Sequence, residues 1–167
     1  MNNIGIIGPD TTNCTKEIYD FGVSLGEHLA IKDRFIICGG MGGFMEAVCS
    51  GVKKSANTFN GQTIGILADD KKECANKFID IPIPTGIGFA RNIIIVNSSD
   101  IIIAAGGGAG TLSELAFAWQ KKKKVLCISA FNGWAKELGG RQLDKRYEGL
   151  FIPVKGIDEI LSHLNIR

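Results

Sequence analysis

Residues 101–115 read IIIAAGGGAGTLSEL, and this stretch decides the fold class. Residues 101–105 are apolar at every position, which is typical of a strand buried on both faces in a parallel sheet. A glycine loop, residues 106–110, follows at once. Residues 111–121 then place their apolar side chains at helical spacing. A buried strand, a glycine loop and a helix in immediate succession predict an α/β protein.

Apolar runs and amphipathic stretches alternate along the rest of the chain. Further strands are predicted at residues 4–7, 34–38, 63–68, 78–83, 125–129 and 150–154. Further helices are predicted from a cap at Thr12 or Asn13 to Ala30, and at residues 44–54, 88–97, 134–138 and 157–164. This alternation indicates βαβ units. We therefore predict one Rossmann-like domain over residues 1–167: a doubly wound, mainly parallel sheet with helices on both faces.

Composition and charge exclude several classes of protein. Hydrophobic residues make up 45% of the chain and charged residues 22%, which excludes a disordered, collagenous or coiled-coil chain. Lys and Arg number 19 against 17 Asp and Glu, so we expect no nucleic-acid partner. There is neither an N-terminal leader nor a membrane-length apolar run, so we expect a cytoplasmic protein without a membrane partner. The five cysteines lack a CxxC pair, which favours a reducing compartment and no metal site.

Glycine is the outlier, at 22 of 167 residues, and much of the excess lies in two loops that each follow a predicted buried strand. Ligands bind at this edge of a parallel sheet, where glycine lets backbone N–H groups approach an anion. We therefore predict one small phosphorylated ligand between the loops, with tight strand–helix packing as the alternative. The predicted ligand-binding residues are Gly39, Gly40, Met41, Gly42, Gly43, Gly107, Gly108, Ala109, Gly110 and Thr111.

The glycine spacing argues against the commonest nucleotide-binding folds. Neither loop has the GxGxxG pattern of a dinucleotide site, because Met45 and Thr111 stand where the third glycine belongs. The P-loop pattern GxxxxGK[ST] is absent. A conventional Rossmann dehydrogenase and a P-loop NTPase are therefore both disfavoured.

Arg91 and Glu114 are the charged residues of interest. Glu114 follows Thr111 by three positions, so it completes a capping box if Thr111 caps its helix. Alternatively, its carboxylate faces a phosphate site and meets positive charge developing on a sugar, while the hydroxyl of Thr111 reaches a phosphate oxygen. Arg91 is the sole charged residue of stretch 86–96 and needs an anionic partner. That partner is either Glu114, in a structural ion pair, or the phosphate of a ligand.

These residues resemble the motifs of the LOG-like ("lonely guy") nucleotide-binding superfamily. The family motif PGGxGTxxE is similar to residues 106–114, with Gly106 in place of the proline. Arg91 matches the family's upstream arginine by its spacing to Glu114, although Asn92 stands where the family has lysine. Glu46, in the segment after the first glycine loop, replaces a usual glycine. The segments 89–92 and 105–114 look more like the branch that contains the molybdenum-cofactor carriers.

The resemblance to LOG enzymes implies a phosphoribohydrolase, which splits a nucleoside 5′-monophosphate into a free base and ribose 5-phosphate. Arg91 and Glu114 would then be the catalytic residues: Glu114 stabilises the oxocarbenium ion or orients water, and Arg91 holds the phosphate. No metal or other cofactor is required for this reaction. The alternatives are a non-catalytic carrier with molybdopterin in the same pocket, or a nucleotide sensor. The family also implies a homodimer or larger homo-oligomer, with the helix around Trp119 as either an interface or ordinary core.

Overall fold

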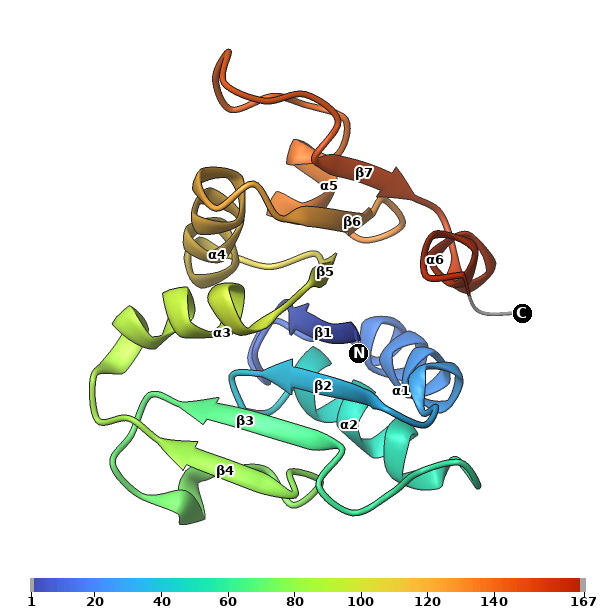
Figure 1. The fold of residues 1–167 in the computed structure, drawn as a ribbon, viewed down its shortest axis with the longest axis vertical. Coiled ribbons are helices and arrows are strands. Elements are labelled where there is room, and N and C mark those ends of the chain that lie inside the picture. The colour runs from blue at the N-terminus through green and yellow to red at the C-terminus, as the bar shows by residue number, and fades with distance from the viewer. Residues whose placement is uncertain (1, 166–167) are drawn as a thin grey trace.

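Seven parallel strands form one sheet within residues 2–165, the part of the chain that the computed structural model describes (Figure 1). The strands are β1 (Asn2–Ile7), β2 (Arg34–Cys38), β3 (Thr63–Leu67), β4 (Ile81–Pro84), β5 (Ile101–Ala105), β6 (Lys124–Ile128) and β7 (Phe151–Val154). Their order is β4-β3-β2-β1-β5-β6-β7, and every neighbouring pair is parallel. The predicted doubly wound Rossmann-like fold is therefore confirmed, with a sheet that is parallel throughout.

Helices cover both faces of this sheet. They are α1 (Lys16–Leu29), α2 (Phe44–Lys54), α3 (Asn92–Ser98), α4 (Ala109–Gln120), α5 (Trp134–Leu138) and α6 (Ile157–His163), together with the short 3-10 turns η1 (Lys72–Cys74) and η2 (Gly88–Arg91). Helices α1, α2 and α6 pack on one face, and α3, α4 and α5 pack on the other (Figure 1).

The alternation of side chains along β5 shows how one strand serves both cores. Ile103 and Ala105 belong to the apolar cluster under α1, α2 and α6. Ile102 and Ala104 belong to the cluster under α3, α4 and α5. All four side chains are fully buried, which explains why the strand has no polar position.

The first helix begins later than predicted. Helix α1 starts at Lys16, and its cap is Thr15, whose hydroxyl accepts a backbone N–H three residues further on at 3.3 Å. The predicted caps, Thr12 and Asn13, instead lie in a turn in which Oδ1 of Asp10 accepts both of their backbone N–H groups. This turn extends the loop between β1 and α1.

The predicted strand at residues 78–83 exists, but it is shifted toward the C-terminus. Strand β4 spans Ile81–Pro84 and so contains both Pro82 and Pro84. It lies at the edge of the sheet, where a residue without an N–H group is tolerated. The predicted helix at residues 88–97 is also confirmed, with η2 as its first turn and α3 as its body.

Trp119 is a core residue. Its side chain is 1% exposed and packs against the ring of Phe151, with ring centroids 5.4 Å apart. Its Nε1 donates a hydrogen bond to Oδ1 of Asp144 at 3.0 Å. The packing alternative for this helix face therefore holds, and the indole ring is unavailable to a partner chain.

Candidate functional site

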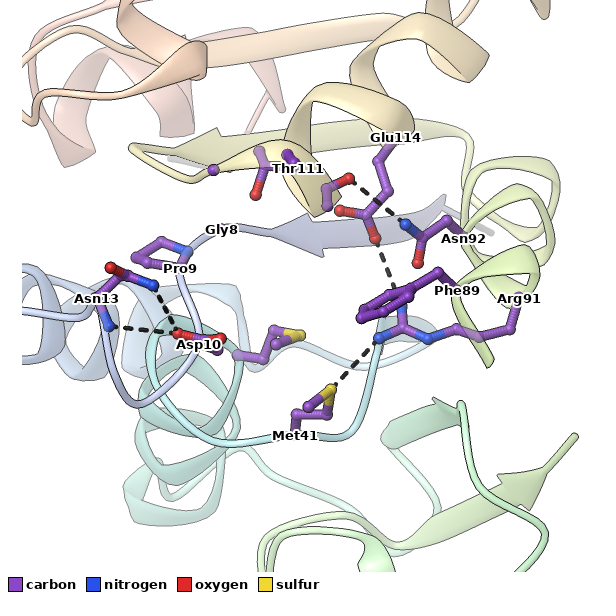
Figure 2. A pocket seen from close by; sticks show the side chains of 14 residues that line it. Gly8, Pro9, Asp10, Asn13, Met41, Phe89, Arg91, Asn92, Thr111 and Glu114 are labelled. Carbon is purple, nitrogen blue, oxygen red and sulfur yellow. Dashed lines mark hydrogen bonds and ion pairs between the residues drawn. The ribbon is translucent and has the colours of Figure 1, made fainter. Parts of the chain in front are cut away.

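An open cleft of about 240 Å³ lies at the carboxyl edge of the sheet, where the loops after β1, β2 and β5 meet (Figure 2). Strand β1 lies between β2 and β5, and the chain winds outward in opposite directions from it. This is the switch point of the sheet, where ligands bind in folds of this class. The lining residues are Gly8, Pro9, Asp10, Asn13, Met41, Met45, Phe89, Arg91, Asn92, Gly108, Ala109, Gly110, Thr111 and Glu114.

The second glycine loop is held in shape by α5. The N–H groups of Trp134 and Ala135, at the start of α5, donate hydrogen bonds to the carbonyl oxygens of Gly107 (3.1 Å) and Gly106 (3.0 Å). The C=O and N–H of a trans peptide group point in opposite directions, so the N–H groups of Gly107 and Gly108 point away from α5. These two N–H groups are therefore available to a hydrogen-bond acceptor outside α5.

The start of α4 adds further donors to the cleft. The first N–H bond within this helix runs from Leu112 to the carbonyl oxygen of Gly108, at 2.9 Å. The N–H groups of Ala109, Gly110 and Thr111 precede it and have no acceptor in the helix. All three residues line the cleft, where the helix dipole favours negative charge. An anionic group of a ligand would find both donors and a favourable field here.

The capping-box alternative for Thr111 is wrong. Helix α4 begins at Ala109, and its cap is Gly108, which leaves Thr111 inside the first turn and Glu114 in the second. The side chain of Thr111 lies against Gly107, where an added Cβ would come within 2.2 Å of its Oγ1. The capping role is therefore excluded for both Thr111 and Glu114, and both side chains lie at the cleft.

Arg91 and Glu114 meet in the wall of the cleft (Figure 2). Nη1 of Arg91 lies 3.5 Å from Oε1 of Glu114, and the two side chains are only 5% and 8% exposed. Burial raises the pKa of Glu114 to about 8, and the charge of Arg91 opposes only part of that rise. Burial also lowers the pKa of Arg91, but a guanidinium keeps its proton. At neutral pH the pair therefore carries net positive charge, which suits an anionic ligand.

Gly39 leaves room for the guanidinium of Arg91, and one N–H group of that guanidinium has no partner in the described chain. An added Cβ at Gly39 would lie 2.3 Å from Nη2 of Arg91, so this glycine makes room for the side chain. The same Nη2 donates to Sδ of Met41 at 3.6 Å (Figure 2). Nε is buried and has no hydrogen-bond partner in the described part of the chain. An unpaired buried donor on a charged group is costly, because it has lost its hydrogen bond to water without gaining one from the protein.

The first glycine loop contributes less to the cleft than predicted. Met41 lines the cleft, and Gly39 acts through Arg91. The other three glycines do not line the cleft, and each allows close approach to a neighbouring segment. An added Cβ at Gly40, Gly42 and Gly43 would lie 2.4, 2.1 and 2.4 Å from Leu67, Thr11 and Pro9. Packing accounts for the glycine at these three positions, and their contact with a ligand stays a prediction.

Sequence reasoning missed the loop after β1, which forms a third side of the cleft. Gly8, Pro9, Asp10 and Asn13 line it. Oδ1 of Asp10 accepts hydrogen bonds from the backbone N–H of Asn13 (3.2 Å) and from its side-chain Nδ2 (3.1 Å). The available signal was the position of this loop directly after the first buried strand.

Two further lining residues come from η2 and α3 and were also missed. Nδ2 of Asn92 donates to Oγ of Ser113 at 2.7 Å and to the carbonyl oxygen of Gly110 at 3.4 Å. Asn92 thereby ties α3 to the first turn of α4 and positions the donors there. Phe89 is 76% exposed at the edge of the cleft. Both residues flank Arg91 in sequence, which was the signal that pointed to them.

A family model described as the SLOG cluster4 family matches residues 1–157. The chain belongs to this family. A curated protein of Archaeoglobus fulgidus, described as uncharacterised, is 44% identical over 128 residues, which cover 77% of this chain and 80% of that protein. The match confirms the resemblance to the LOG-like superfamily that residues 106–114 suggest.

Solved structures that are similar over nearly the whole chain include the following two. The molybdenum cofactor binding protein of Rippkaea orientalis is 30% identical, with a TM-score of 0.82 over 98% of this chain and 95% of that chain. The molybdenum cofactor carrier protein of Chlamydomonas reinhardtii is 27% identical, with a TM-score of 0.81 over 99% and 97%. These neighbours place the chain in the branch that the sequence motifs favour.

Two features are absent from residues 2–165. None of the helices described there has the length and apolarity needed to cross a bilayer. In the same residues, His, Cys, Asp and Glu side chains form no group of three or more that would hold a metal ion.

Proposed function

We propose that this protein binds a small phosphorylated ligand of the molybdopterin or nucleotide class in the cleft, and that it holds this ligand as a carrier. The observation that carries the proposal is Arg91, a buried guanidinium whose Nε lacks a partner in the described chain and whose neighbouring carboxyl is mostly neutral at pH 7. The N–H groups at the start of α4 provide the complementary donors. The similar proteins named for the molybdenum cofactor support the same ligand class.

The residues present fit a phosphate-bearing cargo. The space around Gly108 is open, since an added Cβ there would meet no atom within 4 Å, and the space around Gly110 is equally open. Thr111 adds a hydroxyl to the same turn. In this assignment a phosphate lies against the first turn of α4 and takes a charge-assisted hydrogen bond from Arg91. The pterin or base lies further out in the cleft.

Equilibrium binding of neopterin 3′-phosphate tests the proposal, because this pterin carries a phosphate and has no glycosidic bond to hydrolyse. We expect the wild-type protein to bind it and to bind neopterin without phosphate at least tenfold more weakly. Arg91→Met should abolish that preference. Arg141→Met is the matched control, because it removes the same charge from an exposed side chain in α5's flanking loop. Equal binding of the two pterins by the wild-type protein would refute the proposal.

Co-expression in cells that make molybdopterin supplies a second test. The wild-type protein should retain molybdopterin through purification, measured as the fluorescence of its oxidised pterin, and the Arg91→Met protein should not. The Arg141→Met protein should retain as much as wild type. Loss of the pterin from all three proteins would count against the carrier role.

Hydrolysis of a nucleoside 5′-monophosphate is the second candidate function, and Glu114 favours it. A carboxyl group with a pKa of about 8 at a cleft is a suitable general acid for a leaving base at neutral pH. In this reaction water adds across the broken N-glycosidic bond to give the free base and ribose 5-phosphate. Incubation with AMP, CMP, GMP and UMP, followed by an assay for ribose 5-phosphate, tests it. Any product formed should disappear in Glu114→Ala.

A further inference from the structure

Phe89 is an exposed aromatic side chain on the wall of the cleft (Figure 2). Its exposure of 76% is the highest among the large hydrophobic residues that are exposed in the described chain. A phenyl ring in water gives up the stabilisation that burial would supply. Its place beside a polar cleft therefore calls for a contact that the protein core does not provide.

Backbone hydrogen bonds fix the segment that carries this ring. Three N–H groups just before Phe89 donate to carbonyl oxygens at the end of β3 and in the loop after it. These bonds run from Thr85, Gly86 and Gly88 to Leu67, Asp69 and Ala68, at 3.3, 3.1 and 3.0 Å. Phe89 and Arg91 then lie in the same short turn, η2. The exposure of the ring is thus a property of an anchored turn, and the ring is placed two residues from the guanidinium.

Met41 provides a second apolar surface on the Arg91 side of the cleft. Its side chain is 39% exposed, and its Sδ accepts a hydrogen bond from Nη2 of Arg91, which fixes its position (Figure 2). Thioethers make favourable contacts with aromatic rings. Asp10 and Asn13 lie on the opposite side of the cleft from Phe89 in Figure 2.

We propose that Phe89 and Met41 form a stacking platform for a planar heteroaromatic ring, a pterin or a purine, on the phosphorylated ligand. This inference rests on the proposed function, which assigns the phosphate to Arg91 and the start of α4. Stacking on an aromatic face tolerates many ring types, because every such ring has a π-face. The platform therefore selects ligands that carry a ring over those that carry a phosphate alone.

The experiment compares two ligands that share a phosphate and a three-carbon polyol chain: neopterin 3′-phosphate and glycerol 3-phosphate. Dissociation constants are measured by titration calorimetry for wild type, Phe89→Ala, Phe89→Tyr and Ile87→Ala. Ile87 is the matched control, because it is an apolar side chain on the same segment, 50% exposed, that does not line the cleft. The high exposure of Phe89 keeps its substitutions from disturbing the fold, which circular dichroism checks.

We expect wild type to bind neopterin 3′-phosphate at least tenfold more tightly than glycerol 3-phosphate, a difference of about 1.4 kcal/mol. Phe89→Ala should remove this ratio and leave glycerol 3-phosphate binding unchanged, whereas Phe89→Tyr and Ile87→Ala should keep the ratio.

Four outcomes would overturn the platform. If the two ligands bind wild type equally, or Phe89→Ala weakens both alike, the platform is wrong and the phosphate site stands. If Phe89→Ala leaves the ratio intact but changes the mass in sedimentation, the ring serves contact with a second copy instead. If neither ligand binds, the platform and the proposed function both fail.

Discussion

Replacement of Glu114 by glutamine should remove a specific dependence of stability on pH. The carboxyl group is buried, and its pKa is raised from 4.5 to about 8 in the folded protein. Between these two pH values the folded chain holds a proton that the unfolded chain has released. The stabilisation is thus fully present below pH 4.5 and is lost as the pH rises through 8. Glutamine keeps the size of the side chain and cannot ionise.

The magnitude follows from the linkage of protons to folding. One extra bound proton lowers the free energy of unfolding by about 1.4 kcal/mol per pH unit. From pH 5.5 to pH 7.5 wild type should therefore lose on the order of 2–3 kcal/mol relative to Glu114→Gln. With a urea m-value of about 2 kcal/mol/M, the midpoint of wild type falls by roughly 1 M relative to the variant.

Urea unfolding followed by circular dichroism at several pH values measures this difference. Glu137→Gln is the control, because Glu137 is an exposed acid in α5 that pairs with Arg141, and its difference from wild type should stay flat. A flat difference for Glu114→Gln would mean that burial does not shift this carboxyl. A difference that instead grows in favour of wild type as the pH rises would show an ionised pair with Arg91, and would refute a neutral carboxyl at pH 7.

Four further substitutions test the site. Arg91→Met should weaken binding of neopterin 3′-phosphate at least tenfold. The same substitution should not lower the melting temperature at pH 6, because Nε of Arg91 has no partner in the described chain and the carboxyl of Glu114 is protonated at that pH. Gly107→Ala should lower the free energy of unfolding by about 1–3 kcal/mol, since its φ is 86° and the new Cβ would lie 2.2 Å from Oγ1 of Thr111. Gly108 has open space around it, so Gly108→Ala should change the free energy of unfolding by less than about 0.5 kcal/mol in the same urea titration. Gly39→Ala should displace the guanidinium of Arg91, because Nη2 would lie 2.3 Å from the new Cβ. Calorimetry should then show ligand binding weakened as much as in Arg91→Met. An unchanged affinity would mean that Gly39 has no part in the site.

The fold was predictable because its strongest signals are local. Strands that are apolar throughout, such as β5, do not suit a sheet with one face exposed to solvent, so they indicate helices on both faces. The alternation of strands and helices then leaves few possible topologies. The prediction of the first helix was wrong about its start, because a short-range polar contact sets where that helix begins. Asp10 holds Thr12 and Asn13 in a turn, so α1 begins at Lys16, and no periodicity reveals that turn.

The site was predictable in part, and tertiary contact explains the rest. The sequence left two partners open for Arg91, Glu114 or a ligand phosphate, and the folded chain brings it to Glu114. Glycine alone does not distinguish a backbone that approaches a ligand from one that approaches another segment. Gly51, in α2, lies where an added Cβ would be 1.9 Å from a carbonyl oxygen of α1. Its role is the close crossing of α1 and α2.

The bonds from α5 to the second glycine loop have a consequence for how ligand is exchanged. The start of α5 satisfies the carbonyl oxygens of Gly106 and Gly107 from within the chain, so this loop needs no ligand to take its shape. A ligand of the proposed class would therefore meet a loop that is already formed. In a carrier of the proposed kind, release would then depend on competition, dilution or the proton on Glu114, because the loop itself has no need to refold.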